Sequence, residues 1–187
     1  MAKIRRDEVV AAALVLLNEV GIEDLTTRRL ADKLGIKSAT LYWHFRDKAA
    51  LLGEMAEEVM ATHHRVTTSQ PASEWPEWFA ENARSFRRAL LLYRDGARLH
   101  AGTRPGSEQV SSKTDYLMAA GFTHEEALMA LGTTSHFTVG CVLEEQSHLE
   151  RGVSAESGKL IAISAESIFE FGLRIIVEGL RNTIDKR

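Results

Sequence analysis

The chain has 187 residues, of which 44% are hydrophobic and 26% charged, as in ordinary globular proteins. Its single cysteine, Cys141, excludes an internal disulfide and favours a reducing, cytoplasmic setting, where we expect it to act as a small buried hydrophobe. No apolar run is long enough to cross a membrane, and the polar start lacks the apolar stretch of a signal peptide. The scarcity of proline, with three in the whole chain, predicts an all-α fold.

The charge is distributed unevenly along the chain. The formal net charge is -3, so the molecule as a whole is not a basic polyanion binder. Residues 1–48 carry nine Lys or Arg against seven Asp or Glu, whereas the remainder carries fourteen against nineteen. This mild asymmetry permits nucleic-acid binding by the N-terminal part.

Four helices are predicted at the N-terminal end. Apolar residues at helical spacing give a first helix over about 6–20, which Gly21 ends. A second helix ends at Gly35, a third covers about two turns, and a fourth carries an apolar face from Leu51 to Val59. The N-terminal caps expected for the last three helices are Thr26 or Thr27, Ser38 and Asp47.

The remaining two thirds of the chain also consists of helices separated by breakers. Residues 69–78, which contain two prolines, are expected to form a loop. Residues 102–106 form a breaker run, and residues 152–158 form a connector between two glycines. The predicted helices are about 77–93, 95–101, 108–120, 124–148 and 160–183.

The run T-T-R-R-L-A-D-K-L-G-I-K-S-A-T-L-Y-W-H-F at 26–45 has the order helix, glycine turn, helix. This order is typical of a helix-turn-helix, whose second helix enters the major groove of DNA. Its polar, basic and aromatic side chains suit contacts to bases and phosphates. The expected DNA-binding residues are Thr27, Arg28, Lys37, Ser38, Ala39, Thr40, Tyr42, Trp43, His44 and Lys48.

The same segment resembles a known family of regulators. T-x-R-x-L-A-x-x-L-G, followed by T-L-Y-W-H-F-x-x-K-x-x-L-L, is similar to the tetracycline repressor (TetR) family over about residues 5–52. The resemblance implies an all-α fold in which a three-helix DNA-binding head sits on a helical core that dimerises and binds a ligand. We accordingly expect a DNA-binding domain over 1–46 and a ligand-binding and dimerisation domain over 47–187.

Three runs in the core, at 82–91, 93–105 and 135–148, resemble the tetracycline-responsive members of that family. The chemistry of their residues is consistent with such a ligand. Asn82 and Phe86 share one helix face, and an amide beside a ring suits an oxygenated polycyclic molecule. His100, Thr103 and Glu144 offer an imidazole, a hydroxyl and a carboxylate that could surround a hydrated Mg²⁺.

The resemblance assigns these residues specific roles toward a tetracycline bound as its magnesium chelate. It implies that His100 ligates the metal, while Thr103, and Glu144 from the other subunit, hold metal-bound waters. The implied ligand-binding residues are His64, Asn82, Phe86, His100, Thr103, Arg104, Pro105, Leu131, Ser135 and His136.

The chain also departs from those relatives. The segment between Pro105 and Gly121 is about three residues shorter, and a glutamine in the middle of that helix has no clear match. Lys113 or Thr114 falls nearby, and a lysine beside the chelate would repel Mg²⁺ unless it points to solvent. The connector after residue 148 is also shorter. At the turn, residues 37–39 read Lys-Ser-Ala where the relatives have Glu-Gln-Pro, which predicts a different operator sequence.

The last helix is predicted to form a dimer interface. It carries one apolar stripe of Phe169, Leu173, Ile176 and Leu180, and a second of Ile168, Phe171 and Ile175. Two stripes are too many for a one-sided surface helix, so one can face the subunit core and the other a partner. Burial of both stripes within a monomer is the alternative.

Together these features predict a one-component repressor that binds operator DNA as a homodimer and is released by a tetracycline–Mg²⁺ chelate, controlling drug resistance or efflux. In this mechanism the ligand moves segment 95–105, which is expected to abut the helix that begins after Asp47. The alternatives are a repressor with another lipophilic or polyketide inducer, a helical interaction module, and an enzyme. The enzyme is disfavoured because the sequence lacks H-E-x-x-H, G-x-S-x-G and P-loop motifs.

Overall fold

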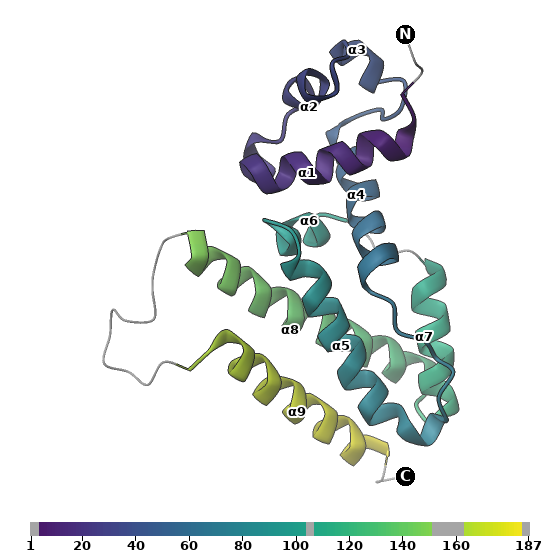
Figure 1. The fold of residues 1–187 in the computed structure, drawn as a ribbon. Coiled ribbons are helices and arrows are strands. Elements are labelled where there is room, and N and C mark those ends of the chain that lie inside the picture. Colours follow the sequence, from purple (N-terminus) through teal and green to yellow (C-terminus); the bar gives the residue numbers. More distant parts are fainter. Residues whose placement is uncertain (1–3, 104–106, 151–162, 185–187) are drawn as a thin grey trace.

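The computed structural model describes residues 4–103, 107–150 and 163–184. Within these ranges the regular structure is entirely helical, as predicted, and a small N-terminal head stands on a larger bundle (Figure 1). The helices are α1 (Arg6–Asp24), α2 (Thr27–Leu34), α3 (Ser38–Leu41), α4 (Lys48–His63), the 3-10 helix η1 (Ala72–Glu74), α5 (Trp75–Leu91), α6 (Gly96–Ala101), α7 (Ser107–Ala119), α8 (His124–Glu150) and α9 (Ala165–Ile184).

Most of the predicted helix ends in the head are confirmed. Thr26, and not Thr27, caps α2 by accepting a hydrogen bond from the Arg29 N–H at 3.2 Å. Gly35 ends α2 in the left-handed region at φ 64°, a conformation that costs glycine little. The third helix differs from its prediction: α3 has four residues, and its cap position is Lys37, which makes no side-chain cap bond. Ser38 is therefore inside the helix and does not cap it.

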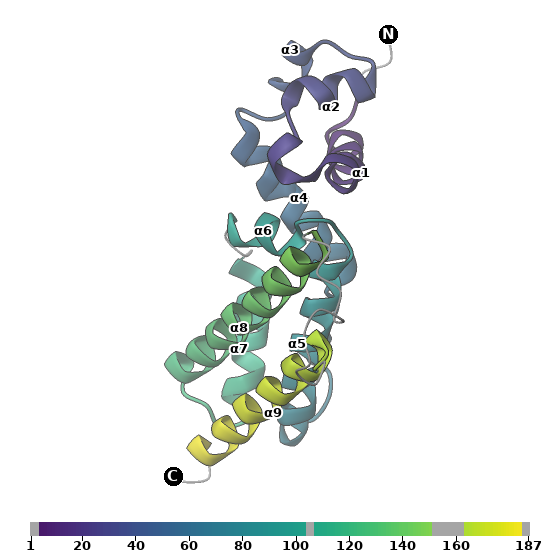
Figure 2. The same ribbon diagram turned by 90° about the vertical axis from the view of Figure 1, so that its left-hand side faces the viewer.

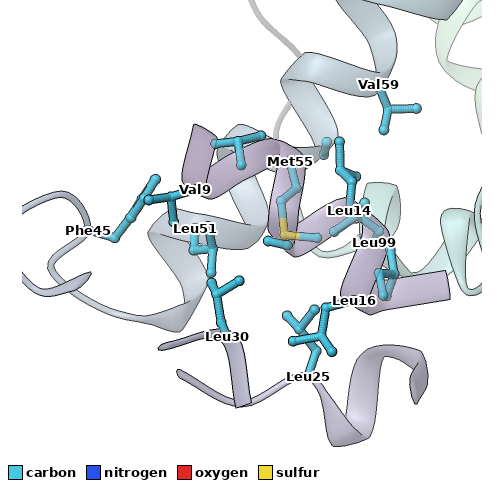
Figure 3. Packing of buried hydrophobic residues seen from close by; sticks show 14 of the residues in the cluster. Val9, Leu14, Leu16, Leu25, Leu30, Phe45, Leu51, Met55, Val59 and Leu99 are labelled. Carbon is cyan, nitrogen blue, oxygen red and sulfur yellow. The ribbon is translucent and has the colours of Figure 1, made fainter. Parts of the chain in front are cut away.

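The head is held together by aliphatic side chains from α1, α2 and the start of α4 (Figure 3). Arg6 adds a polar tie, because it pairs with Glu54 of α4 and its guanidinium lies 4.6 Å from the Phe45 ring centroid. The cluster continues below the head into α6. Its buried members include Val9, Leu17, Leu25, Leu30, Leu41, Leu51, Met55, Val59 and Leu99.

Helix α4 connects the head to the core (Figure 1). Asp47 caps it by accepting the Ala50 N–H at 2.7 Å, as predicted. Since Met55 and Val59 of α4 belong to the same buried cluster as Leu99 of α6, the described part of segment 95–105 does abut this helix. Helix α4 packs against both the head and the bundle, so its contacts assign it to neither. The domain boundary between residues 46 and 47 therefore stays a prediction.

The bundle core is formed by α5, α7, α8 and α9, with α8 and α9 lying side by side (Figures 1 and 2). The loop predicted at 69–78 is wrong in its second half, because η1 and then α5 begin there. Trp75 and Pro76 are buried, so packing overrides the breaker signal, and proline is tolerated in the first turn of a helix.

The last helix begins at Ala165, later than the predicted start at 160, and Ser164 accepts a hydrogen bond from the Ser167 N–H at 3.1 Å. Its first apolar stripe faces the core, with Phe169 and Leu173 each 1% exposed. The second stripe of Ile168, Phe171 and Ile175 remains 54–57% exposed. The connector predicted at 152–158 lies outside the described residues.

None of the described helices is both long and apolar enough to span a bilayer.

Cys141 is half-buried against the core cluster of α5, α8 and α9, and burial raises the pKa of its thiol. A protonated thiol of this kind is a packing group, as expected from the sequence.

Candidate functional site

The first candidate surface is the outer side of α3 and the turn that follows it. Tyr42 is 57% exposed and Trp43 is 89% exposed, whereas Phe45 points into the head core. Of the rings of Tyr42, Trp43 and Phe45, one is therefore used for packing and two are left on the surface. Large rings held outside the core on a helix-turn-helix are available to a partner.

The remaining predicted DNA-binding residues surround these rings. Arg28, Lys37 and Ala39 are exposed, while Thr27, Ser38, Thr40 and His44 are partly buried. Within the described residues, Arg28 and Lys37 form no ion pair, so their charges are free to meet phosphates or bases. Lys48 differs, because its ammonium donates to the Ile22 carbonyl at 3.0 Å and so links α4 to the end of α1.

The second candidate site is centred on His64, at the end of α4. The Lys113 ammonium of α7 lies 2.7 Å from His64 Nε2, and the buried Ser85 hydroxyl lies 3.1 Å from His64 Nδ1. Since an ammonium only donates, Nε2 is the acceptor and the ring is the neutral tautomer with its proton on Nδ1. Burial, followed by the charge of Lys113, lowers the pKa of His64 to about 3.

Phe86 joins His64 to His100. Its ring centroid lies 5.6 Å from that of His64 and 4.8 Å from that of His100, the latter in an edge-to-face arrangement. Burial lowers the pKa of His100, which keeps the imidazole neutral and able to bind a metal. No hydrogen bond to the His100 ring occurs among the described residues, and the Thr103 hydroxyl donates to the His100 carbonyl at 2.9 Å.

Asn82 lies one helical turn before Phe86 and is 9% exposed. Its Oδ1 is buried without a hydrogen-bond partner in the described structure. A buried acceptor left without a partner is destabilising, so such an atom is typical of a position that a ligand or water completes. His64, Phe86 and His100 therefore form one cluster, with Asn82 one helical turn away on the helix that carries Phe86, and the ligand-binding role of these residues stays a prediction.

The structure does not bring the other predicted ligand residues into this cluster by any described contact. Leu131 packs partly against the bundle core, Ser135 is half-buried, and His136 is exposed. Glu144, which the resemblance assigns to the site of the other subunit, has a side chain that is 75% exposed and lies 3.8 Å from His148 on the same helix. Arg104 and Pro105 lie outside the described residues.

The described residues contain no group of three or more His, Cys, Asp or Glu side chains that could hold a metal by themselves. Any metal here would need oxygens supplied by a ligand. Two grooves that the structure does show lie elsewhere, one of about 650 Å³ between α5 and α9 and another of about 450 Å³ beside η1 and α7.

Two residues of this region were missed by the sequence predictions. Ser85 lies three residues after Asn82 and so shares a helix face with it, which is a spacing that could have indicated Ser85. Gln146 of α8 donates to the Tyr93 carbonyl at 2.9 Å and accepts the Ala97 N–H at 3.3 Å. It thereby holds the start of α6, and nothing in the local sequence around Gln146 signals that role.

A three-helix head with exposed aromatic and basic side chains, mounted on a helical core with a polar cluster, defines a DNA-binding regulator. Residues 9–55 match the family described as bacterial regulatory proteins, tetR family, and residues 68–165 match the tetracyclin repressor-like C-terminal domain. The chain belongs to the tetracycline repressor (TetR) family. It is a regulator and not an enzyme, as its relatives are repressors.

Similar proteins include the tetracycline repressor protein class A from transposon 1721 of Escherichia coli, 46% identical over 96% of this chain and 92% of the relative. The class E repressor of Escherichia coli is 41% identical over 100% of this chain and 95% of the relative. TetR(class A) in complex with 5a,6-anhydrotetracycline and magnesium has a TM-score of 0.79 at 46% identity, covering 96% of this chain and 99% of that one. A TetR variant from Acinetobacter baumannii AYE bound to minocycline has a TM-score of 0.86 at 40% identity, covering 97% and 98%.

Proposed function

We propose that this chain is a cytoplasmic, one-component repressor that binds operator DNA as a homodimer and is released by a tetracycline bound as its magnesium chelate. The observation that carries the proposal is the group formed by buried Asn82 and Phe86 with two half-buried, neutral histidines, His64 and His100, in a member of this family. A chain 46% identical to it is a class A tetracycline repressor. An aromatic face flanked by polar groups suits an oxygenated ring system.

The DNA-binding part of the proposal is supported by the surface around α3. Trp43 and Tyr42 contribute little to the head core, so their exposure is consistent with a role in binding. Arg28 and Lys37 supply positive charge beside them. Phosphate contacts of this kind make binding depend steeply on salt.

The homodimer is supported by apolar side chains on α8 and α9 that the single chain leaves exposed. They include Met129, Leu143, Ile168, Phe171 and Ile175. Exposed apolar side chains on two neighbouring helices suit a four-helix interface about a two-fold axis. Such a dimer would present two α3 helices to half-sites about 34–36 Å apart.

The magnesium ion would arrive with the ligand. The His100 imidazole, whose ring nitrogens make no described hydrogen bond, would supply the direct protein ligand. Thr103 of the same subunit, together with Glu144 of the partner subunit, would hold metal-bound waters, which is consistent with the exposure of Glu144 in the single chain. Magnesium keeps several waters and needs few protein ligands, so this small set is sufficient.

Release from DNA requires that the ligand bind a DNA-incompetent arrangement more tightly. A shift from 1:99 to 99:1 needs about 5.5 kcal/mol of differential binding, and DNA must weaken ligand binding reciprocally. Segment 95–103 is the proposed relay, because Leu99 packs with Met55 and Val59 of the helix that carries the head. Movement of α6 would then change the separation of the two heads.

The test is a fluorescence titration of the purified protein with tetracycline, with Mg²⁺ and again with EDTA. Saturable binding that EDTA abolishes, and that His100→Ala weakens strongly, is the expected result. The same protein bound to operator DNA should be released by the chelate, and His100→Ala should resist release. Induction of His100→Ala as readily as the parent would contradict the proposed role of His100.

A second candidate function is a repressor of the same fold with a different oxygenated aromatic inducer. It is favoured by the position of Lys113, which points to His64 and not to solvent. A cation at this point opposes a bound Mg²⁺, as expected for a lysine that faces the site. Dependence of binding on Mg²⁺ separates the two candidates.

A further inference from the structure

We propose that Lys113 is a specificity-determining residue, whose ammonium selects ligands that carry an anionic oxygen on their aromatic ring system. The proposal deepens the proposed function, because it concerns the same cluster and names the class of ligand. It rests on the position of the Lys113 ammonium, 2.7 Å from His64 Nε2, and on the groups around it.

Lys113 lacks an anionic partner in the described structure. Its ammonium contacts a neutral imidazole, and it forms no ion pair within the described residues. The groups whose charge lowers the pKa of His64 are Lys113, His100 and Arg88, all of them cationic or neutral. A half-buried ammonium without a carboxylate is unusual, because long cationic side chains are rarely buried unless paired.

The free protein is therefore less stable than it could be at this point. Burial lowers the pKa of Lys113 to about 8, which shows that the charged form is disfavoured. A lysine at an exposed position of the same helix would carry no such penalty. Local conflicts of this kind are typical of functional positions, where a ligand supplies the missing interaction.

The cluster also defines where the anion would lie on the ligand. The orphaned Asn82 Oδ1 accepts a hydrogen bond, the Lys113 ammonium donates one, and the Phe86 ring lies between His64 and His100. A ring carrying an ionised enol or carboxylate next to a hydroxyl or amide N–H would satisfy both polar groups. Charge-assisted hydrogen bonds are about twice as strong as neutral ones, so the anion is the dominant element.

The test compares two fluorescent probes with the same rings, the anion 1-anilinonaphthalene-8-sulfonate and the neutral N-phenyl-1-naphthylamine. Each is titrated into the dimer, and one high-affinity site per subunit is analysed. Wild type should prefer the sulfonate, and Lys113→Met should lose about tenfold or more in sulfonate affinity while the neutral probe binds as before. Lys113→Arg should keep the preference.

Lys33→Met is the matched control, because it removes a lysine that pairs with Glu19 in the head, far along the chain from the cluster. It should leave both affinities unchanged. Unaltered binding of the neutral probe to Lys113→Met would show that the variant is folded. A sulfonate preference that survives in Lys113→Met, or failure of both probes to bind wild type, would overturn the proposal.

A parallel titration with tetracycline and Mg²⁺ separates this proposal from the proposed function. Loss of the sulfonate preference in Lys113→Met, together with no tetracycline binding by wild type, would support an anion-selecting site with another inducer. Tetracycline binding that is equal in wild type and Lys113→Met, with no sulfonate preference, would leave the repressor function standing and contradict the role of Lys113.

Discussion

The carboxylate of Asp95 accepts a hydrogen bond from the backbone N–H of Ile22 at 2.8 Å, which joins the residue before α6 to the end of α1. The carbonyl of the same Ile22 accepts the Lys48 ammonium at 3.0 Å. Both backbone polar groups of Ile22 are thus satisfied by side chains from distant segments. Since α6 also carries His100, this contact lies between the proposed ligand site and the head.

Asp95→Ala is expected to lower the free energy of unfolding by about 1–3 kcal/mol through the unpaired Ile22 N–H, with a further strain cost because Asp95 has φ 57°. Asp95→Asn keeps an acceptor and tolerates this conformation, so it should lose less. Urea denaturation measures both values. Equal stability of Asp95→Ala and wild type would contradict the role given to this contact.

Gly96→Ala is expected to displace α6. A Cβ at this position would lie 2.0 Å from the Leu90 carbonyl oxygen, which is backbone and cannot simply rotate away. Overpacking of this kind costs roughly 1–3 kcal/mol, and the shift of α6 should also weaken ligand binding through His100.

Gly53→Ala is the control for that substitution. Gly53 lies inside α4 with nothing within 4 Å of an added Cβ, so alanine should stabilise the helix by about 0.5–1 kcal/mol. Thermal or urea unfolding of the two variants should therefore shift in opposite directions. Similar shifts for both variants would show that the Leu90 carbonyl leaves room for a side chain at position 96.

The stability of the ligand-free protein should depend on pH through Lys113. Burial lowers its pKa from 10.5 to about 8, so the unfolded state binds more protons between these values and stability rises with pH across that window. The rise attributable to Lys113 is roughly 3 kcal/mol. The contribution of Lys113 is obtained by measuring the free energy of unfolding against pH for wild type and for Lys113→Met and taking the difference. Lys113→Met should be the more stable protein at neutral pH, and the two curves should converge above pH 10.

His64 should make the stability of the folded protein depend on pH in the acidic range as well. Its pKa is lowered to about 3, chiefly by burial and then by Lys113, so stability should fall as pH decreases from 6.5 toward 3. His64→Gln should flatten this part of the profile. A profile that is unchanged by the substitution would mean that His64 is protonated at its ordinary pKa in the folded protein.

Phe171→Glu is expected to convert the dimer into a monomer. Phe171 is 57% exposed on the second stripe of α9, and a carboxylate there would have to be desolvated in the apolar two-fold interface. Analytical ultracentrifugation measures the mass, and operator affinity should fall with it. Val15→Glu changes a residue of similar exposure, 51%, on α1 and should leave the dimer intact.

Local chemistry made much of the fold predictable. Gly35 ends α2, Thr26 caps α2 and Asp47 caps α4, as expected, because caps and left-handed turns depend on a few adjacent residues. The start of α5 was misplaced, because burial of Trp75 and Pro76 outweighed the local breaker signal. The length of α3 was overestimated, since a turn at residues 42–44 leads back to the buried Phe45.

The amino-acid sequence by itself determined the all-α class and the helix-turn-helix, and its resemblance to the family predicts Asn82, Phe86, His64 and His100 as a ligand set, because each depends on periodicity, short-range spacing or motif resemblance. Only the tertiary structure decided that Lys113 meets His64, that Asp95 holds Ile22, and that Glu144 leaves its own core. These pairs depend on how distant helices pack. Burial then determines which side chains are neutral, charged or left without a partner.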